Sequence, residues 1–184
     1  MMMKEISLHA LDIIQNSIAA NATLIEINLH VDHVQDRMVL SISDNGCGMT
    51  ETFQREVLDP FVTSRTTRKV GLGIPMFQAG AEAAGGTFSL ESTVGVGTRI
   101  EASYQISHWD RPPLGNIAET LYTSILCNEG LDFAFTYTVD DKNFRADTRE
   151  IKAVLGDVPL HTPEVSAWLK EYLYEGIEAL NGGV

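Results

Sequence analysis

The sequence predicts an α+β protein, a two-layer α/β sandwich in which helices cover one face of a mixed or antiparallel sheet, followed by a small α+β C-terminal unit. Segments with apolar residues at helical spacing alternate along the chain with segments that change character at every second residue. The 184 residues include 44% hydrophobic residues and 15 glycines, an ordinary composition for such a fold.

The first helix is predicted at residues 4–21, which contain no proline or glycine and place apolar residues on one stripe. Asp12 and Asn16 are four positions apart and therefore share a face beside that stripe. The amide oxygen of Asn16 could bind a hard cation, and the carboxylate of Asp12 could orient or deprotonate a water. For Asp12 taken alone, simple solvent exposure is the alternative.

Two strands with one buried face follow, at 22–31 and 38–43. The second leads into Asp44-Asn45-Gly46-Cys47-Gly48-Met49. An acid at a strand end, followed by Gly-x-Gly, suggests a carboxylate at a pocket floor beside backbone that a flat ligand can approach. An ionised carboxylate only accepts hydrogen bonds, so it suits an exocyclic amine such as that of adenine. A plain turn is the alternative, because Asp, Asn and Gly dominate turns for steric reasons.

A short helix is predicted at 50–57 with Thr50 as its cap. The polar stretch 62–70 then holds three cations in an otherwise acidic chain: Arg65, Arg68 and Lys69. This stretch is either a solvated loop or a lid whose cations approach a polyphosphate.

Gly71-Leu72-Gly73 opens the next predicted helix, at 74–84. Glycine-rich backbone at a helix N-terminus directs free N–H groups and the positive end of the dipole to one place, which attracts phosphate. Two alternating strands, at 87–92 and 98–106, complete this part of the chain. The chain has neither a Rossmann start nor a Walker-type Gly-Lys-Ser/Thr, so a nucleotide site here must have another design.

The net charge of the chain disfavours some classes of binding partner. A net charge of −12 disfavours binding to nucleic acid and to anionic membrane surfaces. No segment approaches the roughly 18 to 20 apolar residues that span a bilayer, and the N-terminus lacks the apolar run of a signal peptide. Cys47 and Cys127 have no companions at metal-ligand spacing. We therefore expect a cytoplasmic protein.

Four motifs in order resemble the ATP-binding fold shared by DNA gyrase, Hsp90 chaperones, histidine kinases and MutL, the GHKL or Bergerat fold. The resemblance covers roughly residues 4–106. Residues 12–27 resemble the first family motif in its MutL form, and residues 44–49 resemble the second motif. Residues 59–64 and 70–74 resemble the histidine-kinase lid and its glycine box. Residues 85–92 and 95–98 resemble the closing strands.

The resemblance implies ATP and Mg²⁺ as cofactors, with Asn16 holding the metal that bridges the phosphates. Asp44 would accept from the adenine amine, with Thr98 sharing a water, and Asp12 would be the catalytic carboxylate. The nucleotide-binding residues expected from the resemblance are Asn16, Asp44, Gly46, Gly48, Met49, Lys69, Gly71, Leu72, Gly73 and Thr98.

Two departures from the family pattern bear on catalysis. Members that hydrolyse ATP carry Glu at the position of Asp12, and the shorter side chain reduces the reach to a water by about 1 Å, so weak hydrolysis is expected. The phospho-acceptor helices of histidine kinases are also missing before the ATP-binding segment, so autophosphorylation in cis is not expected.

The sequence divides into a histidine-kinase-like ATP-binding domain at 1–107, a proline-stiffened linker at 108–115 and an α+β unit at 116–184. The last unit resembles no family we recognise. Its predicted elements are a helix at 116–127, a hairpin of strands 131–139 and 143–147, and helices at 148–155 and 163–180. It is small for an independent core, so it is expected to pack on the first domain or to dimerise.

These observations favour an Mg-dependent ATP-binding protein that acts as a regulatory switch, or as a serine- or histidine-type protein kinase, on a protein partner. Whether it is an enzyme stays open at this point. One alternative is a GHKL ATPase whose slow hydrolysis drives formation of a homodimer. A degenerate fold used only for protein binding is the other.

Overall fold

The computed structural model describes residues 5–59 and 73–180. Twelve elements are found in these ranges, in the order α1 (Ile6–Ala19), β1 (Leu24–Asp32), β2 (Arg37–Asp44), α2 (Glu51–Leu58), α3 (Gly73–Ala83), β3 (Phe88–Thr93), β4 (Gly97–Gln105), α4 (Ile117–Cys127), β5 (Asp132–Val139), β6 (Lys142–Asp147), α5 (Thr148–Leu155) and α6 (Pro163–Glu178). The strands form one six-stranded sheet in the order β3-β4-β2-β1-β5-β6.

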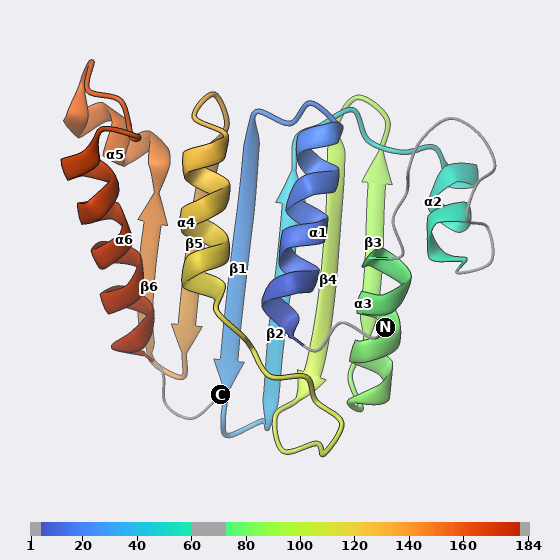
Figure 1. The fold of residues 1–184 in the computed structure, drawn as a ribbon. Coiled ribbons are helices and arrows are strands. Elements are labelled where there is room, and N and C mark those ends of the chain that lie inside the picture. The colour runs from blue at the N-terminus through green and yellow to red at the C-terminus, as the bar shows by residue number, and fades with distance from the viewer. Residues whose placement is uncertain (1–4, 60–72, 181–184) are drawn as a thin grey trace.

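The sheet is mixed, because β1 and β5 are parallel while the other neighbours are antiparallel. Figure 1 shows α1, α3, α4 and α6 on one face of the sheet. Alternate residues of β1 are buried, so Ile25 and Ile27 lie within the core while Glu26 and Asn28 are exposed. The predicted two-layer α+β fold is confirmed.

The C-terminal segment shares this sheet with the first 107 residues. β5 pairs along β1 from Leu24 opposite Asp132 to Val31 opposite Val139. Phe133 and Phe135 of β5 are buried in the same core as the apolar face of β1. The segments before and after residues 108–115 therefore share one hydrogen-bonded sheet and one core.

Helices α1 and α3 contact each other through an aromatic pair. His9 stacks on Phe77 with ring centroids 5.3 Å apart and an angle of 29° between the planes. His9 is 2% exposed, and its Nδ1 has no hydrogen-bond partner in the part of the chain that the structure describes. Burial lowers the pKa of His9, because the charged ring would be desolvated.

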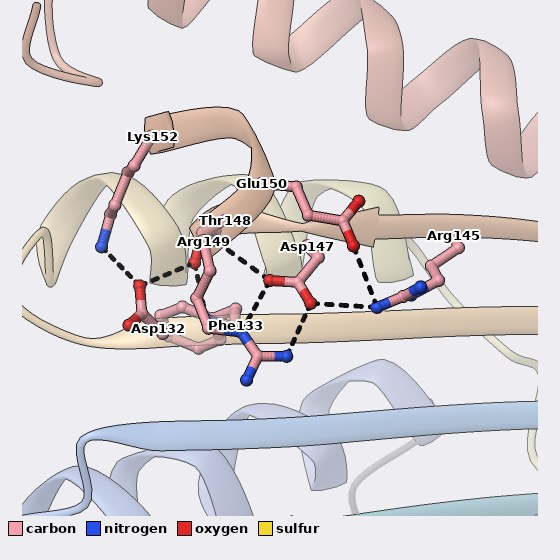
Figure 2. A network of polar contacts seen from close by, with 8 residues as sticks. All are labelled: Asp132, Phe133, Arg145, Asp147, Thr148, Arg149, Glu150 and Lys152. Atoms are coloured by element: carbon pink, nitrogen blue, oxygen red, sulfur yellow. Dashed lines mark hydrogen bonds and ion pairs between the residues drawn. The ribbon is translucent and has the colours of Figure 1, made fainter. Parts of the chain in front are cut away.

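Ion pairs and hydrogen bonds link β6 to α5 where the strand meets the helix (Figure 2). Asp147, the last residue of β6, caps α5 by accepting from the backbone N of Arg149 at 3.0 Å. Its carboxylate also accepts from Arg149 Nε at 3.0 Å and Nη2 at 2.7 Å, and from Arg145 Nη2 at 3.2 Å. These hydrogen bonds, above all those from the Arg149 side chain, lower the pKa of Asp147 to about 2.

Within residues 5–59 and 73–180, no helix combines the length and the apolar character that crossing a bilayer requires.

Candidate functional site

A cavity of about 400 Å³ lies where α1, α2 and the start of α3 meet neighbouring ends of β2 and β4. Four of its lining residues are polar and come from α1, β2 and β4: Asn16, Ser17, Asp44 and Thr98. Most of the remaining wall is apolar and includes Ile13, Met49, Phe53, Val57, Ile74 and Ile100. An apolar cavity with a few convergent polar groups is the usual form of a small-molecule site.

α1 presents Asn16 to the cavity together with Ile13, Ser17 and Ala20. These positions follow the i, i+3, i+4, i+7 spacing of one helix face, so the helix period itself brings them together. Asn16, one of the residues predicted from the sequence, therefore lies in the cavity wall. Its side-chain amide offers both an acceptor oxygen and donor N–H groups to a ligand.

The Asp44 carboxylate is held in place by two donors. The Gly46 backbone N–H donates to Oδ1 at 2.9 Å, and the Ser17 hydroxyl donates to Oδ2 at 2.6 Å. Neither donor is charged, and no ion pair to Asp44 is found in the part of the chain that the structure describes. The carboxylate therefore forms part of the cavity wall and can still accept further hydrogen bonds.

Thr98 lies opposite Asp44 in the register of β2 and β4, which explains why residues so distant in sequence share the cavity. Its hydroxyl is 2.8 Å from the hydroxyl of Ser92. Ser92 also accepts from the backbone N of Met49 at 2.8 Å. Strand pairing and this short chain of hydrogen bonds bring Thr98 and Met49 to the same end of the sheet as Asp44.

Two glycines of the predicted motif allow close packing of the turn after β2. A Cβ at Gly46 would lie 2.8 Å from the Cβ of Ala20, so a side chain there would push the turn away from α1. Gly48 has φ +67°, and a Cβ there would collide with the Thr93 carbonyl oxygen. Gly48 also lines the cavity.

Asp12 lies one turn before Asn16, against the first residue of α3. A Cβ placed on Gly73 would be 2.5 Å from Oδ2 of Asp12, so the carboxylate occupies the space that a side chain would need. Burial raises the pKa of Asp12, and no cation pairs with it among the residues that can be described. A raised pKa makes a carboxylate a better proton acceptor near neutral pH.

Three of the predicted nucleotide-binding residues, Lys69, Gly71 and Leu72, lie outside the described residues, as does the predicted lid at 62–70. The structure brings together Asn16, Asp44, Gly48, Met49 and Thr98, and it places Asp12, Gly46 and Gly73 beside them.

Ser17 was not identified from the sequence. Part of the signal was present, because Ser17 follows Asn16 directly and stands one turn after the buried Ile13. A hydroxyl on the buried side of a helix needs a partner, but the sequence does not distinguish a carbonyl of its own helix from an acid on a neighbouring strand.

Comparison with known families shows the family of the chain. Residues 2–107 match the family described as histidine kinase-, DNA gyrase B-, and HSP90-like ATPase. The chain belongs to this family. The resemblance that the sequence motifs suggested is thereby confirmed, and the cavity lies within the matched residues.

Two sequence relatives are sensor proteins by name, and the chain is similar to a small part of each. It is 32% identical over 102 residues to a protein of Shewanella frigidimarina assigned as a sensor protein, covering 54% of this chain and 16% of that protein. It is 32% identical over 81 residues to the virulence sensor protein BvgS of Bordetella bronchiseptica, covering 41% of this chain and 6% of BvgS.

Two solved structures share the fold. The Aquifex aeolicus MutL ATPase domain complexed with ADP aligns with a TM-score of 0.51 and 13% identity, over 83% of this chain and 69% of that one. The N-terminal domain of a DNA repair protein aligns with a TM-score of 0.51 and 15% identity, over 85% of this chain and 58% of that one. Because 83% of the chain is more than residues 1–107 can supply, the shared fold extends into the C-terminal segment.

Proposed function

We propose that this protein binds ATP together with Mg²⁺ and that nucleotide occupancy controls a protein partner, either as a switch or by phosphoryl transfer to that partner. The observation that carries the proposal is the Asp44 carboxylate, oriented by two donors at the wall of a cavity that also holds Asn16. An oriented acceptor for an amine and an amide oxygen for a hard cation match the two ends of a metal-bound adenosine triphosphate.

The apolar wall suits the flat base. Met49, Phe53 and Ile100 line the cavity with Asp44, so a purine could lie among apolar side chains while its amine donates to the carboxylate. Thr98 adds a hydroxyl at the same edge, able to hold a water between the base and Asp44.

The donor set fits a metal that arrives with the phosphates. No group of three or more His, Cys, Asp or Glu side chains that could hold a metal ion occurs in residues 5–59 and 73–180. Mg²⁺ commonly keeps one or two protein ligands and takes the rest from substrate phosphates and water. Asn16 would hold it through its amide oxygen, and the ion would neutralise charge on the phosphates.

Asp12 is the candidate proton acceptor. It lies one turn from Asn16 and against the N-terminus of α3, and burial raises its pKa. Its short side chain favours slow hydrolysis in water, so the proposed chemistry is transfer to a hydroxyl or imidazole of a partner that brings its own acceptor atom to the site.

A GHKL ATPase that dimerises as it slowly hydrolyses ATP is the second candidate. The first motif, residues 12–27, resembles the MutL form, and the overall fold is shared with the MutL ATPase domain. The similarity to segments of two sensor proteins favours the switch or kinase instead. The presence of Asn16 and Asp44 at one cavity disfavours a module that only binds protein.

Calorimetric titration of the full chain with ATP, with and without Mg²⁺, tests the proposal directly. We expect saturable binding that weakens when Mg²⁺ is chelated. Flat titrations at millimolar nucleotide with Mg²⁺ would refute ATP binding.

The two candidates separate in a second experiment. Transfer of the γ-phosphate label to a co-purified protein supports the kinase. Steady release of phosphate, together with a doubling of the protein's mass in solution when ATP is added, supports the dimerising ATPase.

A further inference from the structure

Three loops meet at the end of the sheet that lies away from the cavity (Figure 1). They are the β1–β2 turn at 33–36, the β5–β6 turn at 140–141 and the segment 106–111 that follows β4. Strand order brings them together, because β4, β2, β1, β5 and β6 are consecutive in the sheet. Arg37 and Asp44 are the two ends of β2, seven positions apart, so about 24 Å separates this three-loop surface from the cavity acid along the strand.

Hydrogen bonds join the three loops to one another. Asp36 in the β1–β2 turn accepts from the backbone N of Ser107 at 2.9 Å and from the Ser107 hydroxyl at 2.5 Å. Asp140 in the β5–β6 turn accepts from the backbone N of His33 at 2.9 Å, and its other carboxylate oxygen is 2.9 Å from His33 Nδ1. The three loops therefore form one surface whose backbone is held in place before any partner binds.

Trp109 is 99% exposed in the middle of the tight turn at 108–111. The backbone N of Arg111 closes this turn by donating to the His108 carbonyl oxygen at 3.2 Å. The Arg111 side chain secures it further, because its Nε donates to the Ile106 carbonyl oxygen at 2.8 Å. The indole is thus displayed in solvent on a backbone that is itself well bonded.

The exposure of Trp109 differs from that of the other tryptophan in the chain. Trp168 is 45% exposed, and its ring stacks on Tyr172 with centroids 5.2 Å apart. On the three-loop surface, Val34 of the β1–β2 turn is also 94% exposed. An indole on a fixed turn, on the same surface as a second exposed apolar side chain, is typical of the aromatic anchors that carry the binding energy of protein interfaces.

The charges on this surface indicate the chemistry of the partner. The segments 32–37, 106–111 and 139–142 hold five acids and three basic residues, in a chain of net charge −12. Asp110 and Asp141 are exposed, and no ion pair to either carboxylate is found within residues 5–59 and 73–180. A second copy of the chain carries the same net charge and is repelled, whereas lysine and arginine are attracted. An indole face is also the best aromatic partner for such a cation.

We propose that the three-loop surface is a docking site for a protein partner that presents lysine or arginine side chains to Trp109, Asp110 and Asp141. Trp109 supplies the contact area, and the two carboxylates supply the preference for a cation. The surface is separate from the nucleotide cavity, so this inference does not rest on the proposed function.

Calorimetric titration of the full chain with hexa-arginine amide, at fixed ionic strength, tests the proposal. We expect Trp109→Ala to lower the affinity about tenfold, the loss typical of a truncated interface anchor. The double variant Asp110→Asn/Asp141→Asn should lower it by about as much. These side chains are exposed, so the variants should fold, and thermal melting verifies this.

Glu164→Gln/Glu171→Gln is the matched control, because it removes the same amount of charge from exposed positions of α6. Its affinity for hexa-arginine amide should stay within about twofold of the parental value. Equal losses in the two double variants would show only a general attraction to an acidic chain, and they would overturn the docking site.

Tryptophan emission provides a second readout. Trp168→Phe leaves Trp109 as the single indole of the chain. We expect a saturable change in its emission with hexa-arginine amide and none with hexaglutamate. Emission that does not respond to hexa-arginine amide would overturn the contact with Trp109.

The remaining outcomes separate this proposal from its alternatives. A mass in solution that is double that of the single chain for the parent, but not for Trp109→Ala, would assign the surface to a second copy and overturn the cationic partner. ATP affinity should be the same in Trp109→Ala and the parent, and its loss in a folded variant would overturn the separation from the cavity. A parent that binds hexa-arginine amide but not ATP would refute the proposed function and leave this inference standing.

Discussion

Asp44 and Asp147 are the same residue type at the same local position, the last residue of a strand, in opposite surroundings. Asp147 is 3% exposed, caps a helix and accepts from two arginine side chains, so its acceptors are occupied by the protein itself (Figure 2). Asp44 accepts from two neutral donors and borders a cavity. An acid whose valences are all met within the chain stabilises the fold, whereas an acid that is oriented but incompletely satisfied can bind a ligand.

The largest expected effect is on nucleotide binding in Asp44→Asn. The amide presents donors where the base amine needs an acceptor, so ATP affinity should fall by at least about 100-fold. The free energy of unfolding should fall by only about 1 to 2 kcal/mol, because the single amide oxygen keeps one of the two donors and no charge pair is lost. Calorimetry and chemical denaturation measure the two quantities, and tight ATP binding by this variant would remove the distinction between the two aspartates.

Asp147→Ala should show the reverse pattern. Loss of the α5 cap and of the arginine pairs should lower the free energy of unfolding by about 2 kcal/mol, a modest value because both arginines are about half exposed. ATP affinity should match the parent, since Asp147 does not line the cavity. A variant that lost nucleotide binding while remaining folded would contradict this separation.

The pH dependence of the unfolding free energy tests whether the charge of Asp147 is responsible for the loss in Asp147→Ala. The pKa of Asp147 is about 2 in the folded protein and 3.8 in its ordinary state, so its contribution is present above about pH 4 and disappears as the pH falls towards 2. The difference in unfolding free energy between parent and Asp147→Ala should therefore shrink over this range. A difference that stays constant would show that the carboxylate charge is not involved.

His9 allows a smaller test of the contact between α1 and α3. Its pKa is lowered by burial, so the neutral ring is favoured in the fold, and stability present above the unfolded pKa of about 6.5 is lost as the pH falls. Between pH 7.5 and 5.5 the parent should lose more stability than His9→Phe. A parent whose stability falls no more than that of His9→Phe over this range would contradict the role of the buried ring.

A small effect on binding is expected for Asp12→Asn. Asp12 lies against Gly73 and not among the cavity-lining residues, so ATP affinity should change by less than about threefold. Any hydrolysis or phosphoryl transfer should fall much further, because the amide cannot accept a proton. Binding and turnover that fell together would place Asp12 in nucleotide binding instead.

The sequence predicted the local elements closely, because periodicity and caps are local signals. The first helix was expected at 4–21 and is observed at Ile6–Ala19, and Thr50 caps α2 by accepting from Phe53 N as expected. Asn16 and Asp44 were placed at one site because their motifs carried the chemistry of a metal ligand and an amine acceptor, and the structure brings both to one cavity.

The pairing of strands that are distant in the chain was harder to predict from the sequence. β1 and β5 are parallel and separated by roughly a hundred residues, so no turn fixes their register, and the sequence gives no local sign that they are neighbours. The Ser17–Asp44 bond was missed for a related reason. A serine within a helix has a nearby carbonyl as its ordinary partner, and only the tertiary structure shows that another acceptor is used.

The place of β5 in the sheet has a practical consequence for where this protein can be cut. A fragment ending at residue 107 would retain every residue of the family match but would leave one side of β1 without its hydrogen-bonding neighbour. An uncovered edge of that length invites pairing with other chains. We expect such a fragment to aggregate, whereas a chain cut after α6 should stay monodisperse at the same concentration.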